Sequence, residues 1–343
     1  EMVYTFYILS KSCMPNKLKD AVRHKFKKKN YNNRDWKLYE AGLRSQGDIT
    51  IWFCEDAIAG WNPPVLHKRK RGRQKKYSDL AIETAYVIGL VYKKKLRQTE
   101  GFMRSIVKLL RLDLDIPDHT TLSRRCETIV VSKKKPSPNK DSKPITVIID
   151  STGLKVFGEK EWMSHKHGTK QRKVWRKLHL CIDEDGEILS STLTCHTISD
   201  TSQVEELLKE VKAPIKEMLG DGGYDHPATY HALNAHRSRH PQSPIIQAII
   251  PPNTGFQEAR ETDSLQRLHN IHLIEDKGKL SWQNQMDYGR RSKVENTMHR
   301  YKTLIGNKLR SKTFESQFTE TKIAVQILNR MRNLCVSKVP LAA

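Results

Sequence analysis

The sequence is short of acidic residues and has no long apolar run. Its 343 residues include 38 Asp and Glu against 61 Lys and Arg, which leaves a formal net charge of +23 at pH 7. Apolar runs such as Val147-Ile148-Ile149 fall far below the roughly 20 residues that a membrane-spanning helix needs. These features exclude a membrane protein and predict an acidic polymer, above all nucleic acid, as the partner.

Cysteine is also scarce, and its spacing is uninformative for metal binding. The six cysteines form no Cys-x-x-Cys pair, and no Cys/His group has zinc-finger spacing. The first residues lack the basic start of a secretory signal. We therefore expect reduced thiols in a cytoplasmic protein. Hydrophobic residues make up 37% of the chain, which is enough for a packed core and excludes wholesale disorder.

Changes in composition divide the chain into segments. Residues 1–33 are basic and polar and predict a flexible arm. Residues 34–132 have helical periodicity, and the Lys- and Pro-rich stretch 133–143 predicts a linker. Residues 144–310 have an α/β pattern, and residues 311–343 carry the apolar stripe of a C-terminal helix. The chain is thus predicted to have a helical half followed by an α/β half.

The helical half resembles a helix-turn-helix. Ser78 predicts the N-cap of one helix, a second fits residues 98–110, and a third begins near His119. The third helix carries Arg124 and Arg125, which would contact DNA in such an arrangement. An ordinary three-helix domain fits the pattern equally well. Further expectations are a helix over 35–44, a strand or buried turn over 49–53, and inward-facing Phe102, Ile106, Leu109 and Leu110.

A basic block precedes these helices. Seven of the nine residues in 68–76 are cationic and none is acidic, so the block repels itself and is predicted to be a loop. Its Arg71-Gly72-Arg73 segment suits a DNA minor groove.

The α/β half predicts a mixed sheet flanked by helices. The run 145–149 is apolar and β-branched, as expected of a buried central strand. Asp185-Gly186 predicts a hairpin turn between two further strands. The remaining expected elements are strands over 174–182, 187–194, 217–220 and 245–250, and helices over 202–211, 225–236 (capped by Asp225) and 288–305.

Three carboxylates stand out in this half. Asp150 ends the central strand run, and Asp221 follows a short strand within Leu219–Asp225, where glycines permit a sharp turn. Glu295 lies on the late helix. At roughly 100° per residue, Tyr288, Arg291, Glu295 and Lys302 share one narrow stripe of that helix. Each carboxylate alone has an ordinary structural explanation. A helix stripe that carries an Arg, a Glu and a Lys together favours a functional site over an exposed face with local ion pairs.

Two strand-end carboxylates and one helical carboxylate can hold two divalent cations. Mg²⁺ takes oxygen ligands and keeps positions open for phosphate and water. Two such ions can activate a water or a 3′-hydroxyl and stabilise the leaving oxygen. Arg291 and Lys302 are placed to neutralise a phosphate under attack.

Several motifs together resemble one family. They are Ile149–Lys155, Leu219–Asp225, Tyr288-x2-Arg291-x3-Glu295-x6-Lys302, Gly158–Trp162, Trp175–Leu180, Arg300–Gly306 and Arg71–Ala81. The chain resembles bacterial insertion-sequence transposases of the DDE class, which have an RNase H-like catalytic core. The closest resemblance is to the family named after the fifth insertion sequence, over about residues 34–335.

The resemblance implies a function and a site. Asp150, Asp221 and Glu295 would be the catalytic residues and would bind two Mg²⁺, with Mn²⁺ as a substitute. Tyr288 and its neighbours Arg291 and Lys302 would contact DNA near the transposon end. The helical half would bind terminal inverted repeats, and a homodimer or larger synaptic complex, nucleoid-associated in a bacterium, would cut the ends and join 3′-hydroxyls to target DNA.

Additional DNA contacts are expected from the basic run 166–176, which leads into the strand expected over 174–182. Its cations are candidates for the DNA-facing surface, namely Lys166, Lys170, Arg172, Lys173 and Arg176. Trp162 could stack on an unpaired base or belong to the core.

Two other functions fit parts of the sequence. A transposase-derived DNA-binding protein would bind repeats without metal and cleave nothing, although all three carboxylates are present. Another RNase H-like nuclease, such as a junction resolvase, would lack the repeat-binding half and would not join strands.

Overall fold

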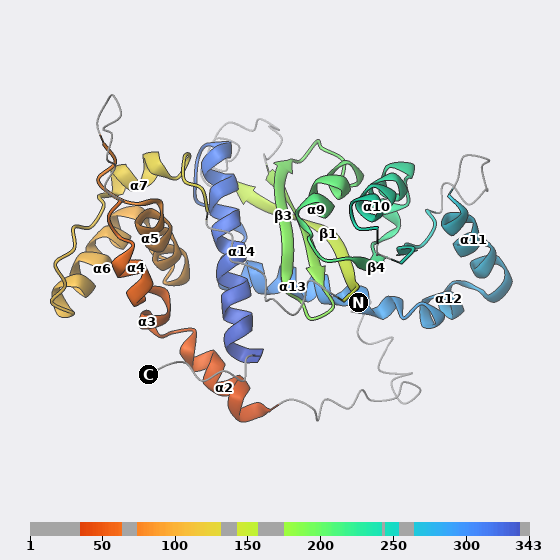
Figure 1. The fold of residues 1–343 in the computed structure, drawn as a ribbon, viewed down its shortest axis with the longest axis horizontal. Coiled ribbons are helices and arrows are strands. Elements are labelled where there is room, and N and C mark those ends of the chain that lie inside the picture. The colour runs from red at the N-terminus through yellow and green to blue at the C-terminus, as the bar shows by residue number, and fades with distance from the viewer. Residues whose placement is uncertain are drawn as a thin grey trace, which may run out of the picture.

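A six-stranded mixed sheet forms the centre of the molecule (Figure 1), in the order β3-β2-β1-β4-β5, with β6 paired to β1. β1, β2 and β3 are antiparallel, whereas β4 is parallel to β1 and β5 is parallel to β4. The strands are β1 (Ile145–Val156), β2 (Trp175–Asp183), β3 (Ile188–Cys195), β4 (Ile215–Leu219), β5 (Gln247–Ile249) and β6 (Lys308–Leu309). The computed structural model describes residues 35–63, 74–131, 143–156, 175–241, 244–253 and 264–336.

Helices cover both faces of the sheet, because β1 has apolar side chains on each of its two faces. Val147 and Ile149 belong to a core cluster with α9 (Val204–Glu210) and α10 (Pro227–Arg239). Ile148 belongs to a second cluster, which includes α13 (Ser292–Leu304) and α14 (Phe314–Val336). Three antiparallel strands followed by two parallel ones, with helices on both faces, form an RNase H-like core, as expected.

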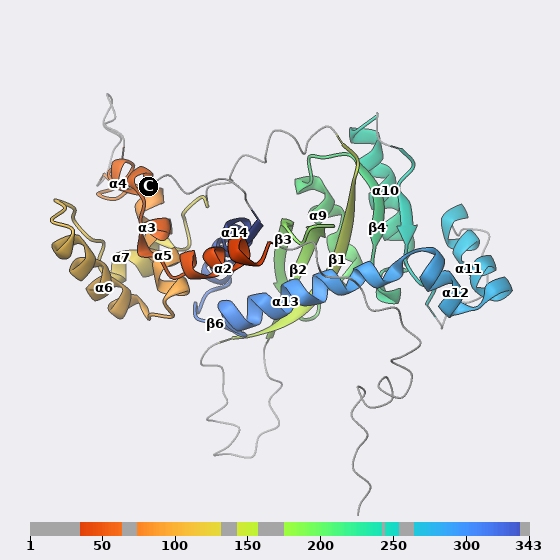
Figure 2. The ribbon, with the colours of Figure 1, turned by 90° about the horizontal axis from the view of Figure 1, so that it is seen from below.

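The helical half consists of short helices packed around α5. Ser78 caps α5 as predicted, since its Oγ accepts a hydrogen bond from the Ala81 amide at 3.0 Å. A 23-residue helix, α14, lies between these helices and the sheet in both views (Figures 1 and 2). The helices of this half are α2 (Trp36–Ser45), α3 (Ile49–Trp52), α4 (Glu55–Ala59), α5 (Asp79–Val91), α6 (Leu96–Leu109) and α7 (His119–Arg125).

α14 joins the two halves through one continuous hydrophobic cluster. The predicted stripe of this helix is confirmed, because Ala324, Ile327, Leu328 and Met331 are all buried. The same cluster contains residues of α5 and of the sheet. The C-terminal helix is therefore part of the core that both halves share.

One expectation for the helical half was left open and another was wrong. Of the two alternatives for residues 49–53, the structure has the buried turn: residues 49–52 form one helical turn with Ile51 and Trp52 buried, and Asp48 caps it by accepting a hydrogen bond from the Thr50 amide. Leu109 and Leu110 are 82% and 54% exposed. The buried face of α6 instead carries Thr99, Met103 and Val107, at the four-residue spacing of a helix.

Three expectations for the α/β half also need correction. β1 continues to Val156, so Asp150 lies within the strand and not at its end. His226, not Asp225, caps α10, because Asp225 is bound by the Arg267 guanidinium at 3.0 Å. The stretch after β5 contains two helices that the sequence did not reveal, α11 (Leu265–Lys277) and α12 (Lys279–Gln285).

The part of the chain that the structure describes has no helix that is both long enough and apolar enough to cross a membrane.

Gly42 lets α2 approach α14 closely. A Cβ at this position would overlap the Leu334 carbonyl and the Cys335 Cα. We expect Gly42→Ala to lower the free energy of unfolding by about 1–2 kcal/mol through overpacking, measured by urea denaturation. Gly101→Ala on α6 is the control, because a Cβ there meets nothing within 4 Å and should stabilise the helix slightly. Equal effects of the two substitutions would contradict close packing at Gly42.

Candidate active site

Parallel pairing of β1 with β4 brings the two aspartates together. Ile148 of β1 is paired with Leu219 of β4, so Asp150 and Asp221 lie two residues further along neighbouring strands. Asp221 follows β4, as predicted, and its Oδ1 accepts a hydrogen bond from the Gly223 amide at 2.9 Å. This bond orients the carboxylate at the edge of the sheet.

Glu295 reaches the same place from the first turn of α13, which crosses the sheet below β1 (Figure 2). Arg291 connects the helix with the strand. Its Nη1 donates to Asp150 Oδ2 at 3.1 Å, and its Nη2 donates to Glu295 Oε1. One guanidinium therefore bridges two of the three predicted catalytic carboxylates.

The neighbours of Asp150 shift its pKa in opposite directions. Burial raises the pKa of the Asp150 carboxyl, and the charges of Asp221 and Glu295 raise it further. The Ser151 amide and the Arg291 guanidinium act in the opposite direction. Three carboxylates thus share a partly buried site, in which a nearby cation favours the charged form of Asp150.

Tyr288 lies beside this site but is held by the protein. Its hydroxyl donates to the Gly220 carbonyl at 3.3 Å, and its ring is 5.4 Å from that of Trp282. Burial raises the pKa of Tyr288. Tyr288 begins a 3-10 turn, η5 (Tyr288–Arg291), rather than the regular helix that was predicted. Lys302 is exposed, two turns beyond Glu295 on α13.

The glycines around Asp221 have a different role from the one expected. Gly220, Gly222 and Gly223 have ordinary φ angles, and the chain turns through a short 3-10 helix, η3 (Gly222–Tyr224). A Cβ at Gly223 would lie 3.0 Å from Asp221 Oδ1. Glycine at this position therefore gives the carboxylate room.

Sequence reasoning missed a network behind Asp150. Asp200 accepts hydrogen bonds from Ser151 Oγ and from Lys177 Nζ, both at 2.9 Å. The Ser151 amide in turn donates to Asp150 Oδ1 at 2.7 Å. Asp200 lies before a 3-10 turn, η2 (Thr201–Gln203), where nothing in the local sequence distinguishes it from a turn residue.

His179 completes this network from β2, opposite Ser151. Its side chain is 0% exposed, and its Nε2 is 2.8 Å from Thr194 Oγ1, whereas its Nδ1 is 3.7 Å from Asp200 Oδ1. Burial lowers the pKa of His179 to about 4. The imidazole is therefore neutral near pH 7.

Of the predicted DNA contacts of the helical half, the structure describes Arg124 and Arg125, which both lie on α7. Arg124 is exposed on α7. Arg125 is bound to the Tyr77 carbonyl at 3.1 Å and to the Asp79 carboxylate. In the α/β half, Arg176 is bound to Gln317 of α14 at 3.0 Å. The other predicted contacts lie outside the described residues: Arg71, Arg73, Trp162, Lys166, Lys170, Arg172 and Lys173.

The donor set suits a divalent cation in its chemistry. Asp150, Asp221 and Glu295 offer only oxygen atoms, the ligands that Mg²⁺ prefers. Among the described residues, however, no three His, Cys, Asp or Glu side chains converge closely enough to hold a metal ion. Arg291, which lies between Asp150 and Glu295, supplies the positive charge instead. The three side chains therefore fit the ion in the type of their donor atoms, while the Arg291 guanidinium bridges two of them in this structure.

Two family models, both described as "Transposase DDE domain", match residues 44–159 and 141–330 of the chain. The second covers more than half of the 343 residues. This chain belongs to the DDE transposases. It is also similar to a solved structure of the Drosophila P element transposase strand transfer complex, with 9% sequence identity and a TM-score of 0.28, over 92% of this chain and 70% of that one.

Membership accounts for the oxygen-rich site, because DDE transposases generally use divalent metal ions such as Mg²⁺. Both matched segments include Asp150, and the second also includes Asp221 and Glu295.

His179 makes the stability of this transposase pH-dependent. Its pKa is about 4 in the folded chain against an ordinary value of 6.5, so neutral His179 favours the fold above pH 6.5. As the pH falls from 6.5 to 4, we expect about 3 kcal/mol of stability to be lost, at about 1.4 kcal/mol per pKa unit. Urea denaturation across this range should show a shallower dependence for His179→Gln. His231→Gln, on the exposed side of α10, should behave as wild type.

Asp200 should support metal binding through Ser151. Asp200→Asn keeps the size of the side chain but weakens its bonds to Ser151 and Lys177. We expect Mn²⁺ binding, followed by electron paramagnetic resonance, to weaken about tenfold, as is typical of residues that orient metal ligands. Asp113→Asn, in an exposed loop, is the control. Unchanged Mn²⁺ affinity in Asp200→Asn would show that Asp150 is positioned without Asp200.

Proposed function

We propose that this DDE transposase cleaves DNA at transposon ends and joins the freed 3′-hydroxyls to target DNA. The observation that carries the proposal is the meeting of Asp150, Asp221 and Glu295 around Arg291. Three separate elements, β1, the end of β4 and the start of α13, deliver these side chains to one edge of the sheet. The match to a transposase family supports the reaction class.

Each residue has a proposed role. Asp150, Asp221 and Glu295 would hold Mg²⁺, and a pair of such ions would supply activation of a water or 3′-hydroxyl and stabilisation of the leaving oxygen. Arg291 neutralises Asp150 and Glu295 in this structure. When it releases them, its N–H groups are free to bind a phosphate oxygen of DNA. Tyr288 holds η5 against the Gly220 carbonyl, which keeps Arg291 and Glu295 at the strand ends.

The remaining proposals concern DNA and assembly. The helical half binds the terminal inverted repeats, and the exposed Lys302 contacts the DNA beyond the cleaved phosphate. Because two ends must be joined to one target, the active form is a homodimer or a larger synaptic complex. Assignment to the family named after the fifth insertion sequence remains a prediction within the DDE transposases.

The two alternatives have less support. A DNA-binding protein without catalysis has no need for three carboxylates balanced by one arginine. A different RNase H-like nuclease does not account for a helical half that shares its core with the sheet through α14.

Glu295→Gln should separate binding from chemistry. We expect DNA binding to be kept and metal-dependent 3′-end cleavage to fall by more than about 100-fold, since even the outer partners of a metal site contribute about 10–100-fold. The assay uses labelled duplex carrying the inverted repeat that flanks the coding region, a target plasmid, and Mg²⁺ or Mn²⁺. Glu275→Gln, exposed on α11, is the control.

Three outcomes are informative. Nicked and joined products that are lost in Glu295→Gln support a transposase. Binding without cleavage in both proteins indicates a DNA-binding protein, and cleavage without joining indicates a nuclease.

A further inference from the structure

A basic groove lies where the helical half meets the segment that links α13 to α14. Its volume is about 740 Å³, and its walls come from α5, α6, α7, β6 and the start of α14. Tyr86, Leu90 and Leu96 contribute apolar surface to it. The cations that line it are Lys93, Lys94, Lys95, Lys308, Arg310 and Lys312.

The two acidic residues of the groove, Glu127 and Glu320, offset only part of the charge of its six cations. Glu320 is 3% exposed, and its carboxylate accepts hydrogen bonds from the amides of Arg310 and Ser311, between 2.9 and 3.1 Å. Glu127 accepts from Thr313 Oγ1 at 2.8 Å. The exposed lysines therefore face solvent across a surface of net positive charge.

The groove is held in shape by contacts between the two halves. Arg310 Nη1 donates to the Gly89 carbonyl at 3.0 Å and to the Lys94 carbonyl at 3.1 Å. These bonds join the segment after β6 to the turn between α5 and α6. The backbone segments that carry the cations are thus held relative to each other before any ligand binds, which lowers the entropy cost of binding.

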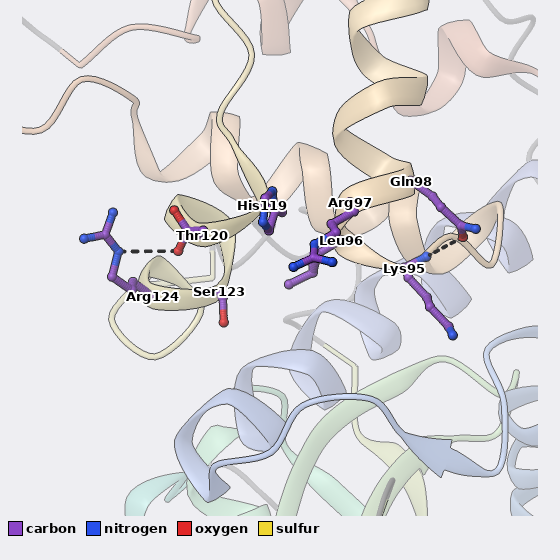
Figure 3. Close-up of a pocket in the computed structure, with 8 residues that line it drawn as sticks. All are labelled: Lys95, Leu96, Arg97, Gln98, His119, Thr120, Ser123 and Arg124. Atoms are coloured by element: carbon purple, nitrogen blue, oxygen red, sulfur yellow. Dashed lines mark hydrogen bonds between the residues drawn. The ribbon is translucent and has the colours of Figure 1, made fainter.

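A second pocket, of about 620 Å³, extends the groove along the helical half (Figure 3). The two pockets share Lys95, Leu96 and Ser123. The second adds Arg97 from the start of α6 and Arg124 from α7, and no acidic residue lines it. Hydroxyl and cationic side chains together are the usual partners of DNA phosphates.

The groove also has a defined position relative to the catalytic carboxylates. Ile305 in its wall directly follows α13, whose first turn carries Glu295, so at 1.5 Å per residue the two lie about 15 Å apart along the helix. Lys302 is exposed on the same helix between them. On the other side, Lys308 of β6 pairs with Lys155 near the end of the strand that carries Asp150.

We infer that this groove binds the sugar-phosphate backbone of one strand of the transposon-end DNA. The 15 Å separation corresponds to about four nucleotides, at about 3.4 Å of duplex axis per phosphate of one strand. The groove thus holds phosphates about four nucleotides from the one that lies at the carboxylates. The inference rests on the proposed function, because the DNA must extend from the groove to the active site.

The first test measures charge contacts without catalysis. Lys94→Glu combined with Lys312→Glu changes both walls of the groove. In EDTA, with a duplex of random sequence, we expect affinity to fall at least about tenfold and the slope of log affinity against log salt to decrease by about two, one for each lost phosphate contact. Lys212→Glu combined with Lys277→Glu makes the same charge change at exposed positions outside the groove and should have little effect. Urea denaturation confirms that both variants are folded.

The second test measures position. Single neutral methylphosphonates are placed along either strand of the inverted-repeat duplex. Substitution about four nucleotides from the cleaved phosphate should weaken binding of wild type but not of the groove variant, because that variant has already lost the contact.

The outcomes separate this inference from the proposed function. Equal losses of DNA affinity in the groove and control variants would contradict DNA binding in the groove. So would a methylphosphonate effect that is the same in wild type and the groove variant. If wild type still cleaves and joins DNA in that case, the proposed function stands. If the groove variant loses affinity as expected but wild type never cleaves, the groove stands as a DNA site and the proposed reaction fails.

Discussion

Parallel pairing of β1 with β4 is the constraint on which the candidate site depends. It brings Asp150, within β1, close to Asp221, which follows β4 and lies far from it in the sequence. Their like charges repel, and burial of Asp150 adds to the cost. Arg291 offsets both effects by bridging Asp150 and Glu295. The ion pairs of Arg291 therefore help to hold the start of α13 against β1 of the sheet.

Support for the site extends behind the sheet. Asp200 binds Ser151 and Lys177, and the Ser151 amide binds Asp150. Ser151 lies on β1, Lys177 lies on β2, and Asp200 follows β3. The antiparallel strands therefore help to orient Asp150, which lies close to Asp221 across the parallel pairing of β1 and β4. Burial lowers the pKa of His179 to about 4, so this side chain of the network is neutral near pH 7.

The long helix α14 gives the molecule its second organising feature. It shares one hydrophobic cluster with both the helical half and the sheet. A groove of fixed shape between the halves follows from this packing, together with the Arg310 bonds to the α5–α6 turn. The residues proposed to bind DNA and those proposed to act on it are thereby held on one framework.

The sequence by itself predicted most of the elements and marked the three carboxylates as candidates. Apolar periodicity is local, so it revealed the central strand, the Ser78 cap and the stripe of α14, and the spacing from Tyr288 to Lys302 marked Arg291 and Glu295. It missed α11 and α12 and misjudged the inward face of α6, which the packing of neighbouring helices decides. Only the tertiary structure decided that Arg291 bridges two carboxylates and that lysines from both halves line one groove. It also decided that Asp200 binds the Ser151 hydroxyl, while the Ser151 amide binds Asp150. Such contacts join residues far apart in the chain, and no local pattern encodes their distance.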